Sequence, residues 1–306
     1  MIGVSMQNLR TIRRLAVFGF LCAFAGVVLT YVVGDATKGA ARWIKFAGFS
    51  LQPSEFIKPV FIVVTAWLLD ANKRIEDFPG MTLAVGLFLL TALSVFGQPD
   101  LGMTVLISGV WALQMVWAGI PVWLIMTLFS AGLVLVTGSY FFLAHVRDRI
   151  DRFLASENEI GSQIQKSMDA FANGNLLGRG PGEGYVKMTL PDVHTDFIFA
   201  LAGEECGVWL TTIIVAAFAA IVVRSMTLSM RDNNLFVMYA ASGLAASLGG
   251  QAIVNMCSAL QLMPAKGMTL PFVSYGGSSM LASCLAMGML LAITRKNAAA
   301  EDKDNG

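Results

Sequence analysis

Charged side chains are scarce in this sequence: Asp, Glu, Lys and Arg make up 13% of its 306 residues, about half the usual share of a soluble domain. Together with 56% apolar residues and a mean hydropathy of +0.68, this scarcity excludes an ordinary cytosolic enzyme, which would need a polar surface. The net charge of only +1 argues against nucleic acid as a partner. The four cysteines show no CxxC spacing, which argues against metal or redox sites of that type. A polytopic helical membrane protein remains.

Eight apolar runs are long enough for membrane-spanning helices, which need about 20 mostly apolar residues. They cover residues 15–33, 53–69, 80–96, 101–119, 121–144, 197–223, 235–263 and 278–294. Residues 145–195 form one long polar loop. The sequence therefore predicts an all-α fold, a polytopic transmembrane helical bundle whose single membrane domain extends over residues 1–306.

Outside the long loop 145–195, whose six Lys and Arg residues count for little in this comparison, Lys and Arg are distributed unevenly between the two sides of the predicted bundle. Ten lie in the segments on the side of the N-terminus, and four lie in the short loops of the other side. Because positive residues concentrate in cytoplasmic loops, both termini are predicted inside and the loop 145–195 outside. Apolar side chains recur at helical spacing over 160–172, which predicts an amphipathic helix in that loop. The outer segment 40–50 is predicted to lie at the membrane interface, with Trp43 at the headgroup level.

Ionisable groups are costly within a membrane, so each of them is a candidate for function. Glu55 and Lys58 are three residues apart and share one face of the second predicted helix. They would either neutralise each other between packed helices or line a polar cavity open to the outer side, and both interpretations stay open. Asp196 follows His194 where the long loop enters the sixth predicted helix. Periodicity alone favours Asp196 as a helix N-cap, since Asp is common at that position.

The last outer loop, residues 264–279, combines prolines and glycines with hydroxyl side chains. Such irregular backbone is tolerated near a membrane only where protein or water satisfies its polar groups. Gln251 and Asn255, one turn apart on the seventh predicted helix, are more typical of hydrogen bonds between helices than of a site. All three polar clusters fall on the outer side, which predicts an outward-facing polar cleft. The candidate residues of the last loop are Ser274, Tyr275, Gly276, Gly277 and Ser278.

Six sequence segments resemble, in the same order, the FtsW/RodA/SpoVE family, the SEDS glycosyltransferases of bacterial cell-wall synthesis. They are GAARWI (39–44), LQPSEF-K (51–58), QPDLG (98–102), GRGPGEG (178–184), LPDVHTDFIFALAGEE-G (190–207) and KGMTLPFVSYGGSS (266–279). The KGMTLP lead into the last segment is more similar to the FtsW branch, the division enzymes, and GRGPGEG is similar to its alphaproteobacterial form. The family has ten helices, so the resemblance implies that the first two are missing here. Gln261 and Ala265 stand where the family usually has Gly and Thr.

The resemblance implies a peptidoglycan glycosyltransferase that polymerises lipid II into glycan strands during septal cell-wall synthesis. The family's catalytic Asp falls on Asp196, which as general base would take the proton of the acceptor sugar hydroxyl while undecaprenyl pyrophosphate leaves with inversion. A divalent cation, Mg²⁺ or Mn²⁺, is a candidate cofactor, and no metal ligands are assigned. The residues expected to bind substrate are Arg42, Glu55, Lys58, His194, Lys266, Ser274, Tyr275, Gly276, Gly277 and Ser278.

The resemblance also implies partners and a location. The expected partners are lipid II, the undecaprenyl-linked glycan, a class B penicillin-binding protein acting as transpeptidase, and other membrane proteins of cell division. The expected location is the bacterial inner membrane at the division septum, with the active site facing the periplasm. Two alternatives stay open. A lipid II flippase would need polar groups accessible from both leaflets, whereas the conspicuous charges gather outside. A non-catalytic scaffold that recruits the transpeptidase is favoured by the missing helices.

Overall fold

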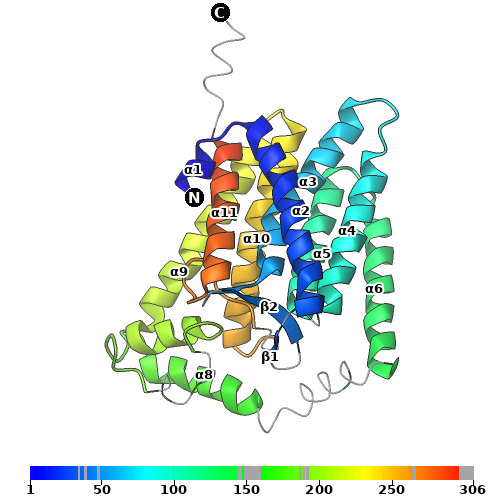
Figure 1. The fold of residues 1–306 in the computed structure, drawn as a ribbon. Coiled ribbons are helices and arrows are strands. Elements are labelled where there is room, and N and C mark those ends of the chain that lie inside the picture. Colours follow the sequence, from blue (N-terminus) through cyan, green and yellow to red (C-terminus); the bar gives the residue numbers. More distant parts are fainter. Residues whose placement is uncertain are drawn as a thin grey trace, which may run out of the picture. The chain divides into compact units, whose positions relative to one another are not determined.

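The computed structural model describes the chain apart from residues 34, 38–39, 47–48, 99, 143–146, 148–159, 186–187, 189, 191–192, 264–266 and 296–306. The sequence predicts one membrane domain, and the structure gathers into two compact units. Unit 1 comprises Met1–Gln114, Phe218–Gly250 and Gly276–Gly306, and unit 2 comprises Met115–Ala217 and Gln251–Tyr275. Both units are built mainly from helices (Figure 1).

A long helix lies over each of the eight apolar runs (Figure 1). By length and apolar composition, α2, α4, α9, α10 and α11 could cross a membrane, counting only the described residues. The polytopic helical fold predicted from hydropathy is thus confirmed, and the number of crossings stays a prediction. The bounds are α2 (Leu9–Val33), α3 (Pro53–Arg74), α4 (Gly80–Gly97), α5 (Leu101–Trp117), α6 (Val122–Phe142), α9 (Ile198–Met230), α10 (Leu235–Ala259) and α11 (Gly277–Thr294).

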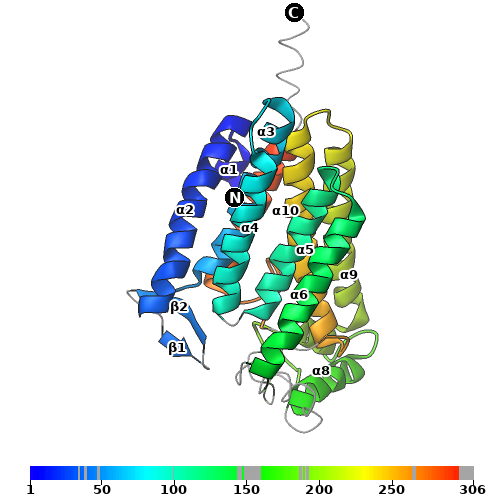
Figure 2. The same ribbon diagram turned by 90° about the vertical axis from the view of Figure 1, so that its right-hand side faces the viewer.

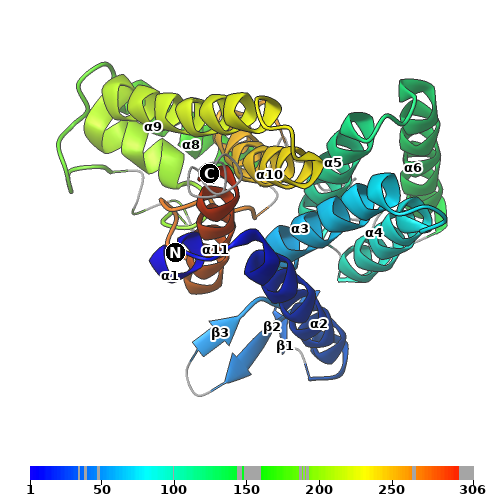
Figure 3. The same ribbon diagram turned by 90° about the horizontal axis from the view of Figure 1, so that it is seen from above.

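Two further helices lie outside the apolar runs. The short helix α1 (Ile2–Ser5) packs against α11 within unit 1 (Figure 3). In unit 2, α8 (Ile160–Gly174) confirms the amphipathic helix that the apolar spacing over 160–172 predicts. Its apolar face packs against the start of α9, where the rings of Phe171 and Phe199 have centroids 5.6 Å apart. The long polar loop therefore carries a helix that packs against the first residues of α9, which follow Asp196 in the sequence.

A small antiparallel sheet in unit 1 departs from the all-helical prediction. Its strands are β1 (Asp35–Thr37), β2 (Ala40–Phe46) and β3 (Phe49–Leu51), paired in the order β1-β2-β3. Trp43 lies opposite Asp35, and Ile44 lies opposite Leu51. Aromatic and β-branched residues such as these favour strands, and the segment is too short to cross a membrane as a helix. The sheet lies beside α2 (Figure 3).

The core of unit 1 is built around α3, which packs against α2, α4 and α11. Figure 2 shows α2, α3 and α4 running side by side. Most side chains of α3 are buried, and Ile57, Phe61 and Val63 have no exposed surface. Within a membrane, such packing is stabilised by van der Waals contact rather than by the exclusion of water. The buried charged groups of α3, Glu55, Lys58 and Asp70, therefore lie in apolar surroundings and need partners.

Helix α9 is interrupted at Gly207, where φ is 72° and ψ is −167°. A Cβ at this position would lie 2.4 Å from the carbonyl oxygen of Leu176, so both the dihedral angles and the space require glycine. The interruption takes two carbonyls out of the helical hydrogen-bond pattern, and the glycine-rich turn GRGPGEG supplies their donors. Arg179 N donates to Glu204 O and Gly180 N to Glu205 O, each at 3.0 Å. The sixth predicted helix is therefore two helical segments that meet at Gly207, and the GRGPGEG turn satisfies carbonyls at the break.

Candidate active site

The tripeptide His194–Asp196 is a short strap that leads into α9 in unit 2. Its three consecutive main-chain carbonyls each accept one hydrogen bond. The His194 carbonyl accepts from Tyr275 N (2.9 Å), the Thr195 carbonyl from the Ser274 hydroxyl (2.5 Å), and the Asp196 carbonyl from the Asn255 side-chain amide (2.9 Å). The backbone that carries Asp196 is thus held at every residue of the strap.

The segment 267–275 is irregular, and its polar groups are satisfied by side chains, as expected for such backbone near a membrane. Gln251 on α10 donates to the Thr269 carbonyl at 2.9 Å, and the Ser274 hydroxyl accepts from Leu270 N at 2.7 Å. The sequence suggests hydrogen bonds between helices for Gln251 and Asn255. The structure assigns both side chains to this segment and, for Asn255, to the strap.

The position of Asp196 relative to α9 bears on its role. The Phe197 carbonyl accepts the first helical hydrogen bonds, from Ala200 N at 3.0 Å and Leu201 N at 3.1 Å. Phe197 thus occupies the N-cap position, and Asp196 lies one residue before it, which weakens the interpretation of Asp196 as a cap. The Asp196 carboxylate is half-buried, and one of its oxygens lies 3.5 Å from where a Cβ of Gly267 would stand. A fixed carboxylate beside an irregular backbone segment is suited to act as a general base.

Glu55 and Lys58 form a buried ion pair on α3 in unit 1. The Lys58 Nζ lies 2.7 Å from the Glu55 Oε2, and the two side chains are only 5% and 8% exposed. Spacing of three residues on one helix brings the groups together without any change of backbone. The contact is the one that mutual neutralisation between packed helices predicts, and the lining of a polar cavity stays a prediction.

The comparisons with known proteins concern the whole chain. The family model of the FtsW/RodA/SpoVE cell cycle proteins matches residues 1–299. This chain belongs to that family. A relative from Caulobacter vibrioides, named probable peptidoglycan glycosyltransferase FtsW, is 42% identical over 296 residues, which is 97% of this chain and 76% of the relative. A relative of the same name from Geobacter metallireducens is 38% identical over 275 residues, covering 86% of this chain and 72% of the relative.

Two solved structures resemble this member of the FtsW/RodA/SpoVE family. One is described as structural coordination of polymerization and crosslinking by a peptidoglycan synthase complex; it matches with a TM-score of 0.79 at 26% identity, over 95% of this chain and 84% of that chain. The other is the rod shape determining protein RodA of Thermus thermophilus, with a TM-score of 0.69 at 25% identity, over 95% and 81%. The helical fold is therefore the one found in solved members of the family.

The structure brings some of the predicted site residues of this family member together. In unit 2, Asp196 is flanked by His194 and Tyr275, whose side chains are exposed, and by the buried Ser274. The Ser274 hydroxyl is engaged by the two hydrogen bonds given above, so it supports the strap from within the protein. The exposed side chains beside Asp196 are the ones available to a substrate.

Several of the other predicted residues belong to unit 1. In unit 1, the Ser278 hydroxyl donates to the Ser50 carbonyl at 2.9 Å and accepts from Gln52 N at 3.1 Å, so it joins the start of α11 to the segment before α3. Gly276 immediately precedes α11 and Gly277 is its first residue, and a Cβ on Gly277 would meet open space. Arg42 lies on β2, but its side chain is outside the described part of the chain, and so is Lys266.

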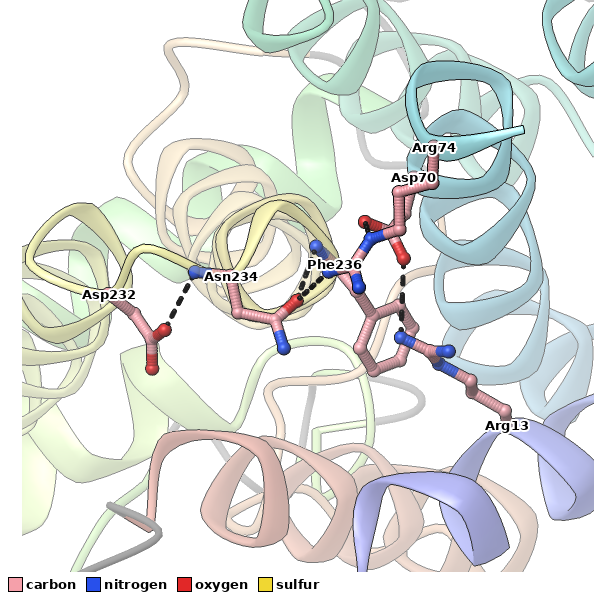
Figure 4. Close-up of polar contacts among 6 residues, drawn as sticks. All are labelled: Arg13, Asp70, Arg74, Asp232, Asn234 and Phe236. Carbon is pink, nitrogen blue, oxygen red and sulfur yellow. Dashed lines mark hydrogen bonds and ion pairs between the residues drawn. The ribbon is translucent and has the colours of Figure 1, made fainter. Parts of the chain in front are cut away.

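A second buried charge cluster, at the other end of α3, was not predicted (Figure 4). The Asp70 carboxylate contacts Arg74 Nε at 2.7 Å and a terminal nitrogen of Arg13 at 3.3 Å, with its side chain 2% exposed. The Arg13 guanidinium lies over the ring of Phe236, 4.0 Å from its centroid, and Arg74 donates to the Asn234 side chain at 3.1 Å. The spacing of Asp70 and Arg74 by four residues is a signal that could have found part of it. The cluster joins α2, α3 and the start of α10.

A protein-only metal site is not found among the described residues. No group of three or more His, Cys, Asp or Glu side chains lies close enough together there to hold a metal ion. Mg²⁺ is commonly held by only one or two carboxylates together with substrate phosphates and water. The candidate Mg²⁺ or Mn²⁺ therefore stays a prediction.

Proposed function

We propose that this chain is a peptidoglycan glycosyltransferase that polymerises lipid II into glycan strands for septal cell-wall synthesis. The observation that carries this proposal is the half-buried Asp196 carboxylate on a strap whose three carbonyls are all held. The names of the relatives from Caulobacter vibrioides and Geobacter metallireducens support the same activity.

In the proposed reaction Asp196 acts as general base. It takes the proton from the 4-hydroxyl of the acceptor sugar, whose oxygen attacks the anomeric carbon of the lipid-linked donor. The new glycosidic bond forms as the bond to undecaprenyl pyrophosphate breaks, with inversion at that carbon. Since a general base works only within hydrogen-bond reach of its proton, a rigid strap favours the reaction.

The leaving pyrophosphate needs positive charge. Arg42, Lys58 and Lys266 are candidates among the basic residues of the motifs that match the family. The buried contact of Lys58 with Glu55 at 2.7 Å neutralises much of its charge, so Arg42 and Lys266 are the better candidates. Mg²⁺ or Mn²⁺, held by one or two carboxylates and the pyrophosphate, is a further candidate source of this charge, and no step is assigned to it.

We propose that the chain lies in the inner membrane with both termini in the cytoplasm. In this orientation the site faces the periplasm. The excess of Lys and Arg in the segments on the N-terminal side supports this orientation. We expect alkaline phosphatase fused after Ala170 to be active and a fluorescent protein fused after Gly306 to fluoresce. Alkaline phosphatase activity from a fusion at Gly306 would contradict the topology.

A class B penicillin-binding protein is the proposed partner, acting as the transpeptidase that cross-links the new strands. The support is the structural match to a peptidoglycan synthase complex described as coordinating polymerization and crosslinking. Lipid II and the undecaprenyl-linked glycan are the proposed substrates, and other division membrane proteins are further proposed partners.

Liposomes containing the purified chain, its class B penicillin-binding protein and labelled lipid II test the activity. We expect labelled glycan strands on a gel, and none from liposomes that lack the chain. Exchange of lipid II between leaflets without polymer would overturn the proposal in favour of a flippase. Intact binding of the partner with neither activity would overturn it in favour of a scaffold.

A further inference from the structure

Asn255 joins the strap and the last outer loop to one helix. Its side chain is 1% exposed on α10, and its amide nitrogen donates to the Asp196 carbonyl at 2.9 Å and to the Met268 carbonyl at 2.7 Å. Both hydrogens of the amide are therefore used, one on each segment. We propose that Asn255 is a positioning residue that sets where the Asp196 carboxylate stands, an inference that rests on the proposed glycosyltransferase function.

The orientation of the Asn255 amide is set by its two acceptors. A flipped amide would point its oxygen at the two carbonyl oxygens. A carbonyl oxygen has no hydrogen to donate, so neither contact would be a hydrogen bond. In the observed orientation the side-chain oxygen is buried and has no hydrogen-bond partner among the described residues. A buried acceptor without a partner costs stability. The orientation therefore gives the strap and the loop one hydrogen bond each, and it leaves the side-chain oxygen of Asn255 without one among the described residues.

Asn255 holds one carbonyl of the strap and one carbonyl of the loop segment near the Asp196 carboxylate. One belongs to Asp196 itself, and the other belongs to Met268, next to Gly267, whose missing Cβ would stand 3.5 Å from the carboxylate. Together with the bonds from Tyr275 N and the Ser274 hydroxyl, this amide group holds the base at a fixed distance from that backbone. A shift of the loop relative to the strap would move that backbone toward or away from the reacting atoms.

The other two hydrogen bonds to the strap have donors in a different part of the chain from the bond that Asn255 donates. Tyr275 N and the Ser274 hydroxyl, which hold the His194 and Thr195 carbonyls, both belong to the last outer loop. Strap and loop could therefore move together if only these bonds were present. Asn255 lies on α10, a long helix, and ties both segments to a rigid element, which is where a precise site is best built.

The alternative is that Asn255 contributes only to stability, as most buried amide groups do. The two roles differ in kinetics. A purely structural loss lowers the amount of folded protein, whereas a displaced base lowers kcat per folded molecule and leaves the KM for lipid II nearly unchanged. A displacement of about 1 Å at a reacting group can reduce the rate by about 100-fold.

The test compares Asn255→Ala and Asn255→Asp with the control Ser167→Ala. Ser167 is buried in unit 2 and its hydroxyl donates to the Ala259 carbonyl at 2.7 Å, so its loss also removes a bond to α10 but leaves the strap untouched. Asn255→Asp keeps the shape of the side chain and supplies at most one donor. We expect kcat to fall about 10- to 100-fold in both Asn255 variants, with KM within about twofold and Ser167→Ala near the unaltered rate.

Hydrogen exchange provides a second measurement that does not depend on catalysis. We expect faster exchange in the peptides covering 193–200 and 267–275 of the Asn255 variants and no change there in Ser167→Ala. Unchanged kcat in both Asn255 variants would overturn the inference, and so would unchanged exchange in these peptides. If the unaltered chain polymerises no lipid II, the proposed function fails while the exchange result still reports whether Asn255 holds the strap.

Discussion

An Asp196→Asn variant is expected to fold and reach the membrane yet polymerise lipid II at least about 100-fold more slowly, the low end for loss of a general base. The amide keeps the shape and polarity of the carboxylate but cannot take up the proton of the attacking hydroxyl. The main-chain carbonyl of Asp196 keeps its bond from Asn255, so the strap should stay in place. The measurement is the polymerisation rate per amount of folded protein, with the partner present.

An Asp196→Glu variant separates the position of the base from its charge. One added methylene displaces the carboxylate by about 1 Å, so this variant should rescue the activity poorly. A capping role predicts a different result, since Asn caps a helix about as well as Asp. Near-normal activity of the Asn variant would therefore contradict the assignment of the base.

Removing one partner of the Glu55–Lys58 pair is expected to destabilise the folded chain by about 3–5 kcal/mol. The two charged groups are 2.7 Å apart and almost fully buried. Glu55→Gln would leave the Lys58 ammonium in apolar surroundings without this carboxylate, and Lys58→Met would do the same to Glu55. The double variant should lose less than the sum of the two single losses, because it leaves neither charge behind.

The coupling free energy between Glu55 and Lys58 is obtained from thermal unfolding in detergent of the unaltered chain, the two single variants and the double variant. Polymerisation rates of the same four proteins are measured in parallel. Lys73→Met is a control on the same helix. It removes a positive charge from an exposed position, so its cost should stay at or below about 1 kcal/mol. Simple additivity of the Glu55 and Lys58 effects would count against a coupled pair.

Several features of the chain could be predicted from local sequence. The eight apolar runs predict the long helices, because the length of an apolar segment reports on its ability to cross a membrane. The apolar spacing in 160–172 predicts α8, and the separation of three residues predicts the Glu55–Lys58 contact. In each case the signal and the structure lie within one element.

Other features required the folded chain. The sheet formed by β1, β2 and β3 depends on pairing between neighbouring segments, which the apolar pattern of a membrane protein does not report. The break at Gly207 depends on the approach of Leu176 and the GRGPGEG turn to α9, and one glycine in an apolar run gives no such signal. The Asp70 cluster joins three helices, and only its Arg74 contact is local.

The site shows the same division. Motif resemblance implies that Asp196 is the base, and the sequence places it where the long polar loop meets an apolar helix. Only the tertiary structure decides that Phe197 takes the N-cap position. It also decides that the strap is held by Asn255, which is 59 residues from Asp196, and by Ser274, which is 79 residues from Thr195. Hydropathy and periodicity describe the surroundings that a single element prefers. Hydrogen bonds between distant residues depend instead on how loops and helices pack, so they emerge only once the chain has folded.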